Sequence, residues 1–486
     1  MTYRFHITAI ALVVTGMMVP RAAGQDTQSG AQQPLPPIAQ PGTTSTAPAA
    51  KPAATGTPVT EGDVDVPDTR PLAGAQELTL GSTTSGHNLL LPSFGVATQV
   101  RTNPYVSGQT DSPSVVSTTF LTGRLGLNYT SGHSELSLNY LAGGSFSNDS
   151  VGGDSGIQSL GFSETIRSGR WSQMIGDQLT YTSQTPFGFG GLGSLNNLGV
   201  NPGSGLGSDP GFRSGFLPDQ SVLINGTTQL NNSVIAQTDY QLSHRASLTF
   251  VGSYGILDFP NDNLQNDSNE TFQAGYNYLL DRKNSVSVFY RFERFGFSNL
   301  AQSTEINGAQ VSYARRITGM LSLQIGGGPQ ADIFRSPLTG PGTVADWSFS
   351  TTLNYRHKNS IMNVGFDRSI TGGSGILAGA QTKEIHGTFT QKIGQNWSAM
   401  ASGGYAKNSA LQQTTPNANT IAPETWFVTA QVSRRFVGYS SLFMSYSAIG
   451  QTSLASVCTL PVCRVNSASN TVSIGYNWGL RGIALE

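Results

Sequence analysis

Few residues in this chain have the types and spacing that catalysis requires. Hydrolysis by a serine or by an activated water needs a general base, usually a histidine held by an orienting partner. The sequence has six histidines, and His386 follows Glu384 at the spacing that puts two strand residues on one face. Such a pair is more often a hydrogen bond along a wall than a catalytic dyad. We therefore predict that the protein is not an enzyme.

Groups that bind metals or cofactors are also sparse in the sequence. It shows no metal-ligand cluster, phosphate-binding loop or haem motif, so we predict no metal site and no cofactor. The only cysteines, Cys458 and Cys463, stand in the run Cys-Thr-Leu-Pro-Val-Cys with no histidine nearby. In an exported protein this pair is predicted to form a local disulfide, which would contribute about 2 kcal/mol by constraining the unfolded chain.

The beginning of the chain predicts export. Arg4 and His6 supply a short basic start, and an apolar stretch follows from 7 to 19. Small residues at 22–24 suit cleavage, so residues 1–24 are predicted to be a removable signal peptide. The apolar stretch is shorter than the about 20 residues that a transmembrane helix needs.

The composition favours a protein that contacts lipid. Charged residues make up 11% of the chain, against roughly 25% in ordinary soluble domains. The formal net charge of −1 gives no field that would attract nucleic acid. A chain without an apolar helix can span a bilayer only as a closed β-barrel, because lipid offers no partners for free backbone groups.

Alternating side chains run from about residue 92 to residue 478. Segments of about ten residues alternate apolar and polar positions, which is the period of a strand with two different faces. Leu121 and Leu125 share one face, for example, while Arg124 lies on the other. The same pattern is clear at 135–140, 347–356 and 472–478, and it is poor around 157–181 and 303–314.

The connections between these segments are sorted by length. Short ones are expected at 131–133, 168–170, 243–245, 281–284, 315–319, 357–359, 392–395 and 434–438. Longer ones, rich in Gly, Asn, Ser and Asp, are expected near 103–115, 147–156, 183–225, 258–269, 295–303, 329–345, 371–380, 407–423 and 449–468. Short turns on one side and long loops on the other are typical of transmembrane barrels, whose turns are periplasmic.

We therefore predict an all-β fold, an antiparallel up-and-down transmembrane β-barrel over residues 86–479 with about 18 strands, sixteen being the alternative. Residues 480–486 would form a C-terminal tail. Residues 25–85, rich in Pro, Ala and Thr, cannot bury enough apolar surface to fold. With both barrel ends on the periplasmic side, this leader would be a disordered spacer or a tether for a partner.

The aromatic residues support the same prediction. One band lies beside the short turns or at the end of the last strand: Tyr129, Tyr240, Tyr278, Tyr355, Trp397 and Trp478. A second band lies toward the long loops: Tyr254, Trp347, Tyr405, Trp426 and Tyr446. Two bands of amphipathic rings match the girdles that form at the two membrane–water interfaces.

In hairpin rhythm, loop sorting and aromatic bands, the chain resembles the porin-like outer-membrane barrels of Gram-negative bacteria. The segment 285–293 also resembles barrels associated with exopolysaccharide export. The resemblance implies an outer-membrane location, contact with outer-membrane lipid and insertion by the barrel-assembly machinery. That machinery reads a terminal aromatic in the family, whereas here Tyr476 and Trp478 are followed by 479–486.

A barrel of this size is wide enough for a water-filled lumen. Side chains expected to line it by strand parity are Arg124, Glu135, Asp239, Arg291, Glu293, Arg356, Asp367 and Glu384. These charges could create a transverse field, or pair into ladders that brace the wall, and their mixture predicts no strong ion selectivity. By resemblance to general porins, the connection 183–225 would fold inward as a constriction, a flexible surface loop being the alternative. The residues of this connection that could form the constriction are Phe187, Phe189, Asp209, Phe212, Arg213 and Phe216.

The predicted function is passive diffusion of small hydrophilic solutes through the barrel. One alternative is a conduit or accessory barrel for exopolysaccharide export, which aromatic or amide side chains on the inward faces would favour. The other is a plugged structural or adhesive surface barrel. No residue marks an oligomer interface, so the sequence predicts no oligomeric state.

Overall fold

The computed structural model describes residues 88–102, 115–148, 155–182, 228–260, 264–298, 302–336, 340–372, 379–411, 424–436, 440–451 and 469–485. All of them belong to one compact unit, Glu61–Glu486. The predicted signal peptide, the leader, the connection 183–225 and the Cys458–Cys463 disulfide lie outside the described residues, and so they stay predictions.

The described residues form antiparallel strands joined by turns. In chain order the strands are β1 Leu89–Thr102, β2 Val115–Ser131, β3 Ser134–Ser147, β4 Ser155–Ser168, β5 Trp171–Thr182, β6 Gln229–Ser243, β7 Ala246–Asp258, β8 Asp267–Leu279, β9 Asn284–Phe297 and β10 Gln302–Arg316. They continue with β11 Leu321–Ser336, β12 Gly340–His357, β13 Ser360–Thr371, β14 Ala380–Ile393, β15 Trp397–Ala410, β16 Glu424–Arg435, β17 Ser440–Gln451, β18 Ser469–Gly479 and β19 Ile483–Ala484. Among these residues, no helix is long and apolar enough to cross a membrane.

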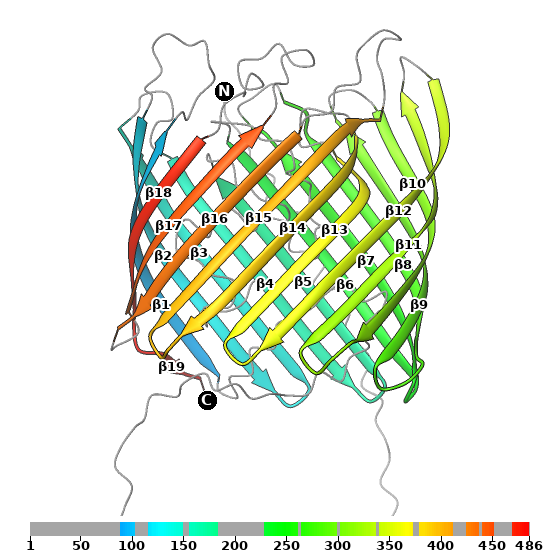
Figure 1. The fold of residues 1–486 in the computed structure, drawn as a ribbon, viewed down its shortest axis with the longest axis horizontal. Coiled ribbons are helices and arrows are strands. Elements are labelled where there is room, and N and C mark those ends of the chain that lie inside the picture. The colour runs from blue at the N-terminus through cyan, green and yellow to red at the C-terminus, as the bar shows by residue number, and fades with distance from the viewer. Residues whose placement is uncertain are drawn as a thin grey trace, which may run out of the picture. The chain divides into compact units, whose positions relative to one another are not determined.

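The strands close into a ring. Each strand pairs with the next one along the chain, and β1 pairs with both β2 and β18. Figure 1 shows these strands running at a tilt around the barrel. Closure leaves no long unpaired edge, which is the condition for spanning lipid with strands. The prediction of about 18 antiparallel strands is confirmed, with the two-residue β19 as an addition.

The predicted short connections lie at one end of the barrel. At the other end only three residues join β11 to β12, so the predicted long connection at 329–345 is wrong, because most of it is strand. The predicted short connection at 168–170 is the turn between β4 and β5, and the one at 131–133 joins β2 to β3. Gly132 and Gly169 have φ values of 50° and 58° at these turns, a conformation that costs glycine little. In Figure 1 these turns lie at the bottom, beside β19 and the C-terminus.

The two ends of the described chain meet at this same end. Leu89 pairs with Ala484, and Leu90 pairs with Ile483. The backbone N–H of Leu485 donates to the carbonyl of Asn88 at 2.9 Å. Residues that the sequence predicted to be a tail therefore include a short strand that continues the pairing of β1 below the end of β18.

The two faces of the wall differ sharply in exposure. On the outward face Phe94 is 59% exposed, Val288 52% and Trp478 58%. On the inward face of β9, Ser285 and Ser287 are fully buried. Side chains diverge on the convex face of a closed sheet and crowd together on the concave one. The exposed apolar residues therefore form an outer belt around the cylinder.

Aromatic residues mark both edges of this belt. Near the tight turns, the rings of Trp171 and Tyr240 lie 4.4 Å apart on adjacent strands. Toward the other end, Tyr254 is 49% exposed and Trp347 is 53% exposed. An apolar belt between two aromatic rows is the lipid-facing surface of a transmembrane barrel.

Candidate functional site: the inner wall of the barrel

The register of the strands places all eight predicted lumen residues on the inward face. Arg124 is the pairing partner of Ser93 and Leu141, both buried on that face. Asp367 pairs directly with Glu384 across β13 and β14. Strand parity on adjacent pairs gives the same side for Glu135, Asp239, Arg291, Glu293 and Arg356. That these side chains line a conducting path stays a prediction.

The charges of this inner face have partners. Arg291 Nη2 lies 3.2 Å from Glu293 Oε2 on the same strand. Glu135 pairs with Arg167 at 3.0 Å near the tight turns. The Asp239 carboxylate accepts hydrogen bonds from Gln237 Nε2 and Thr249 Oγ1. Arg124, Arg356 and Asp367 each take part in an interaction as well. Of the two readings of these charges, this arrangement favours the ladders that brace the wall.

Hydroxyl side chains are the commonest buried polar groups on this face, and amide side chains come next. Those buried in the barrel include Gln99, Asn128, Gln229, Gln237, Asn269, Gln273, Asn277, Gln302, Gln330, Asn408, Gln431, Gln451 and Asn477. Asn277 Nδ2, for example, donates to Thr249 Oγ1 at 2.9 Å. The wall is therefore polar chiefly through uncharged donors and acceptors.

One part of the inner wall is apolar. Ala97, Phe120, Leu141, Ile157 and Phe443 form a buried cluster, and they come from β1 to β4 and β17. We call it the apolar section. Its packing depends on a glycine, because a Cβ at Gly475 would lie 2.4 Å from the Phe443 ring. In the apolar section the inward face therefore carries apolar side chains where strand alternation elsewhere places polar ones.

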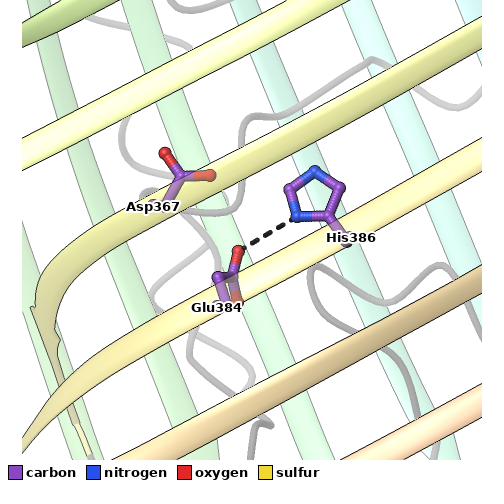
Figure 2. A group of neighbouring side chains, drawn as sticks. All are labelled: Asp367, Glu384 and His386. Carbon is purple, nitrogen blue, oxygen red and sulfur yellow. Dashed lines mark ion pairs between the residues drawn. The ribbon is translucent and has the colours of Figure 1, made fainter.

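Asp367, Glu384 and His386 come together on β13 and β14. Their ligand atoms all lie within 4.8 Å of one another, and His386 Nδ1 lies 3.4 Å from Glu384 Oε1. Figure 2 shows Asp367 facing the other two side chains from the neighbouring strand. We call this group the Asp–Glu–His cluster. The sequence shows only the His–Glu pair, because register alone brings Asp367 to it.

Above this cluster the hairpin β13–β14 leaves the wall. The pairing between β12 and β13 ends at Phe349 and Arg368, whereas β13 and β14 stay paired as far as Thr371 and Ala380. In the part of β13 that follows Arg368, Ile370 joins a buried apolar cluster with Phe295, Phe297 and Ile306 of β9 and β10. The strands β11 and β12 stand between these elements in the sheet. The outer end of the hairpin therefore bends inward across the barrel.

Arg368 holds the bent hairpin to β12. Its Nη2 donates to Asp346 Oδ1 at 2.6 Å, and its guanidinium lies 4.1 Å from the centre of the Trp347 ring. Gln381 of β14 donates to the other oxygen of Asp346. These bonds span the opening where β12 and β13 separate. No local sequence signal announces them, since they depend on where two strands part.

The inward segment that the structure describes is thus not the predicted one. The predicted constriction at 183–225 lies outside the described residues, including Phe187, Phe189, Asp209, Phe212, Arg213 and Phe216. That constriction stays a prediction, and among the described residues it is the outer end of β13–β14 that bends into the barrel. The only hint in the sequence is a Gly-rich connection at 372–379, which the alternation pattern does not distinguish from other loops.

Closure, belt and girdles together define a transmembrane β-barrel of the kind that outer membranes contain. No protein-family model and no curated protein matches the chain.

Among solved structures, the chain matches Pseudomonas aeruginosa outer-membrane proteins at low similarity. The outer membrane protein OpdK is 9% identical, with a TM-score of 0.40. The match covers 80% of this chain and 98% of the OpdK chain. OccK2 (OpdF) in complex with glucuronate is 11% identical with a TM-score of 0.40, covering 82% and 98%. OpdQ is 11% identical with a TM-score of 0.38, covering 80% and 99%.

Proposed function

We propose that this protein is an outer-membrane channel through which small hydrophilic solutes diffuse passively. The observation that carries the proposal is a closed eighteen-stranded wall with an apolar outer belt and a largely polar inner face. Barrels of about this strand number leave an aqueous lumen unless a segment fills it. Cleavage of residues 1–24, a periplasmic leader at 25–85 and insertion by the barrel-assembly machinery belong to the same proposal.

The inner wall suggests which solutes pass best. Away from the Asp–Glu–His cluster its charges have partners, so little net field remains there to favour one sign of ion. Its amides can exchange hydrogen bonds with hydroxyl groups at little net cost, since each solute bond to water is replaced by one to the wall. Uncharged polyhydroxyl solutes fit this surface, and so would a polysaccharide, the alternative that inward amides favour. Size would be limited where the β13–β14 hairpin bends inward.

Conductance of the full mature chain in a planar lipid bilayer tests the proposal. We expect stable steps whose size scales with the conductivity of the bulk salt solution. Folding of the inserted protein is checked by its heat-modifiable migration in a detergent gel. A silent bilayer with folded protein would overturn the channel function and favour a plugged surface barrel.

Swelling of liposomes in sugars of increasing length separates diffusion from export. Sieving predicts that the swelling rate falls steeply from monosaccharide to tetrasaccharide. Protein-free liposomes and liposomes with heat-denatured protein give the background. A rate that is independent of chain length would contradict sieving and favour a polysaccharide conduit.

A further inference from the structure

We propose that the Asp–Glu–His cluster binds a divalent transition-metal ion on the inner wall of the barrel. Asp367, Glu384 and His386 would each supply one ligand atom. The proposal does not depend on the channel function, because it concerns the wall and would hold for a plugged barrel as well.

The geometry of the cluster is close to that of a tetrahedral site. Metal–ligand distances of 2.0–2.2 Å place neighbouring ligand atoms of a tetrahedron about 3.3 Å apart. His386 Nδ1 and Glu384 Oε1 are 3.4 Å apart. The third oxygen lies within 4.8 Å of both, and Asp367 and Glu384 are direct pairing partners. The other two distances would have to shorten toward this value when the ion binds.

A buried acceptor independently points to a ligand here. Glu384 is only 6% exposed. Its Oε1 and the Nδ1 of His386 are buried and lie 3.4 Å apart as an ion pair, but neither atom has a hydrogen bond of good geometry. A buried carboxylate oxygen without a well-aligned donor is costly, and native structures rarely leave one so. A cation between the two atoms would coordinate both.

A glycine keeps the imidazole in position. Gly365 is the pairing partner of His386 across β13 and β14. A Cβ at Gly365 would lie 2.6 Å from His386 Nε2 and 2.7 Å from Cε1. The ring therefore lies over this position because there is no side chain, and Gly365 acts as a positioning residue.

The ligand types select the class of cation. One imidazole nitrogen with two carboxylate oxygens suits Zn²⁺ and its neighbours, whereas Ca²⁺ and Mg²⁺ prefer sets made of oxygen alone. Three protein ligands leave a coordination position for water or for a donor atom of a solute. An organic ammonium group could also pair with the two carboxylates, but it would gain nothing from a neutral imidazole nitrogen except a single hydrogen bond.

Titration of the refolded, tag-free full chain with ZnCl₂ by isothermal calorimetry tests the proposal. We expect a single site that Glu384→Gln and His386→Ala abolish. Gly365→Ala should weaken it at least about tenfold, as loss of a positioning contact does at other metal sites. Gly387→Ala, next to His386 on β14, is the matched control, because its Cβ would meet nothing nearer than 3.6 Å.

Three outcomes would overturn the proposal. The first is no zinc binding by folded wild-type protein. The second is binding that His386→Ala leaves intact, which would assign the zinc to histidines elsewhere. The third is equal weakening by Gly365→Ala and Gly387→Ala, which would indicate a general effect on the wall. Displacement of zinc by millimolar methylammonium would instead identify the cluster as a site for organic cations.

Discussion

Two parts of the inner wall differ in the kind of side chain that they bury on the inward face. The apolar section buries Phe120 and Phe443, each 2% exposed, against neighbours of their own kind. The wall at β13 and β14 instead gathers two carboxylates and an imidazole and then bends away from β12. Both belong to the same closed sheet, and in both successive side chains point to opposite faces of the wall.

The contrast shows that parity decides which face a side chain occupies but not what that face does. An apolar cluster stabilises the wall because its side chains are removed from contact with water. Buried polar groups, by contrast, need hydrogen-bond partners. Sections that keep incompletely paired polar groups depart from what stability alone favours, and such departures concentrate at functional sites. We therefore expect substitutions in the apolar section to affect stability first, and those around β13–β14 to affect transport first.

The largest effect on stability is expected in the apolar section. Phe120→Ala should lower the free energy of unfolding by about 3 to 5 kcal/mol, because the ring leaves a cavity that the strands cannot close. The midpoint of urea unfolding in lipid vesicles measures this loss. Phe94→Ala, on the outer belt at 59% exposed, should cost less. Equal losses would show that the cluster does not brace the wall.

The next effect concerns the bent hairpin. Arg368→Ala removes the charged bonds to Asp346, with an expected loss of roughly 1.5 to 3 kcal/mol, and it should release the outer end of β13–β14. Single-channel records should then show more frequent changes of conductance. Arg335→Ala is the control, since its pair with Glu305 lies on the outer face with Arg335 58% exposed, and such a pair contributes about 0 to 1 kcal/mol. Identical records from both variants would contradict a locking role for Arg368.

A smaller effect is expected on ion selectivity. Glu293→Gln leaves Arg291 without its carboxylate partner, so the wall gains positive charge. The reversal potential in a salt gradient should shift toward anion preference by a minor part of the about 59 mV per tenfold gradient of a perfectly selective pore. Glu424→Gln, whose pair with Lys407 lies on the outer face, should leave the potential unchanged. A shift of the same size in that control would place both charges at the lumen.

The smallest effect is expected at a tight turn outside both sections. Asp281 accepts hydrogen bonds from the Asn284 side chain at 2.7 Å and the Lys283 backbone N–H at 2.6 Å. These bonds lower the pKa of its carboxyl group below the usual value. The turn's contribution is therefore complete above the unfolded pKa of about 3.9 and is lost as pH falls through the lower folded value.

Unfolding midpoints of wild type and Asp281→Ala should accordingly differ slightly at neutral pH and converge in strong acid. Asp281→Asn, which keeps one acceptor oxygen, should lie between them at neutral pH. If the difference in unfolding midpoint between wild type and Asp281→Ala grew as the pH falls, the hydrogen bonds of the Asp281 carboxylate would not be its cause.

The sequence predicts most of the fold because a two-faced strand must alternate. Where alternation is poor, the structure gives the reason. β4 carries Ile157 inward and Leu160 outward, so both faces are apolar. β10 carries Ile306 inward and Glu305 outward, where Glu305 pairs with Arg335. Strands that serve an inner apolar cluster or an outer ion pair lose the pattern that identifies them.

The candidate site was predicted less well. Parity gives the face of Asp367, Glu384 and His386, but only the register of β13 against β14 brings Asp367 beside the other two. The bend of the hairpin depends on contacts between Ile370 and the distant strands β9 and β10. Contacts between residues so far apart along the chain leave no periodic trace in a single sequence.

The short pairing of β19 has a consequence for the order of assembly. Leu89 and Leu90 begin the first strand, yet their second partners, Ala484 and Ile483, stand almost at the end of the chain. During export, Leu89 and Leu90 have no native partner on that edge of β1 until residues 483–484 have followed. An uncovered strand edge readily pairs with another chain. We therefore expect the pairing of residues 483–484 with β1 to cover this edge. It would end the period in which the unfinished barrel can pair with another chain.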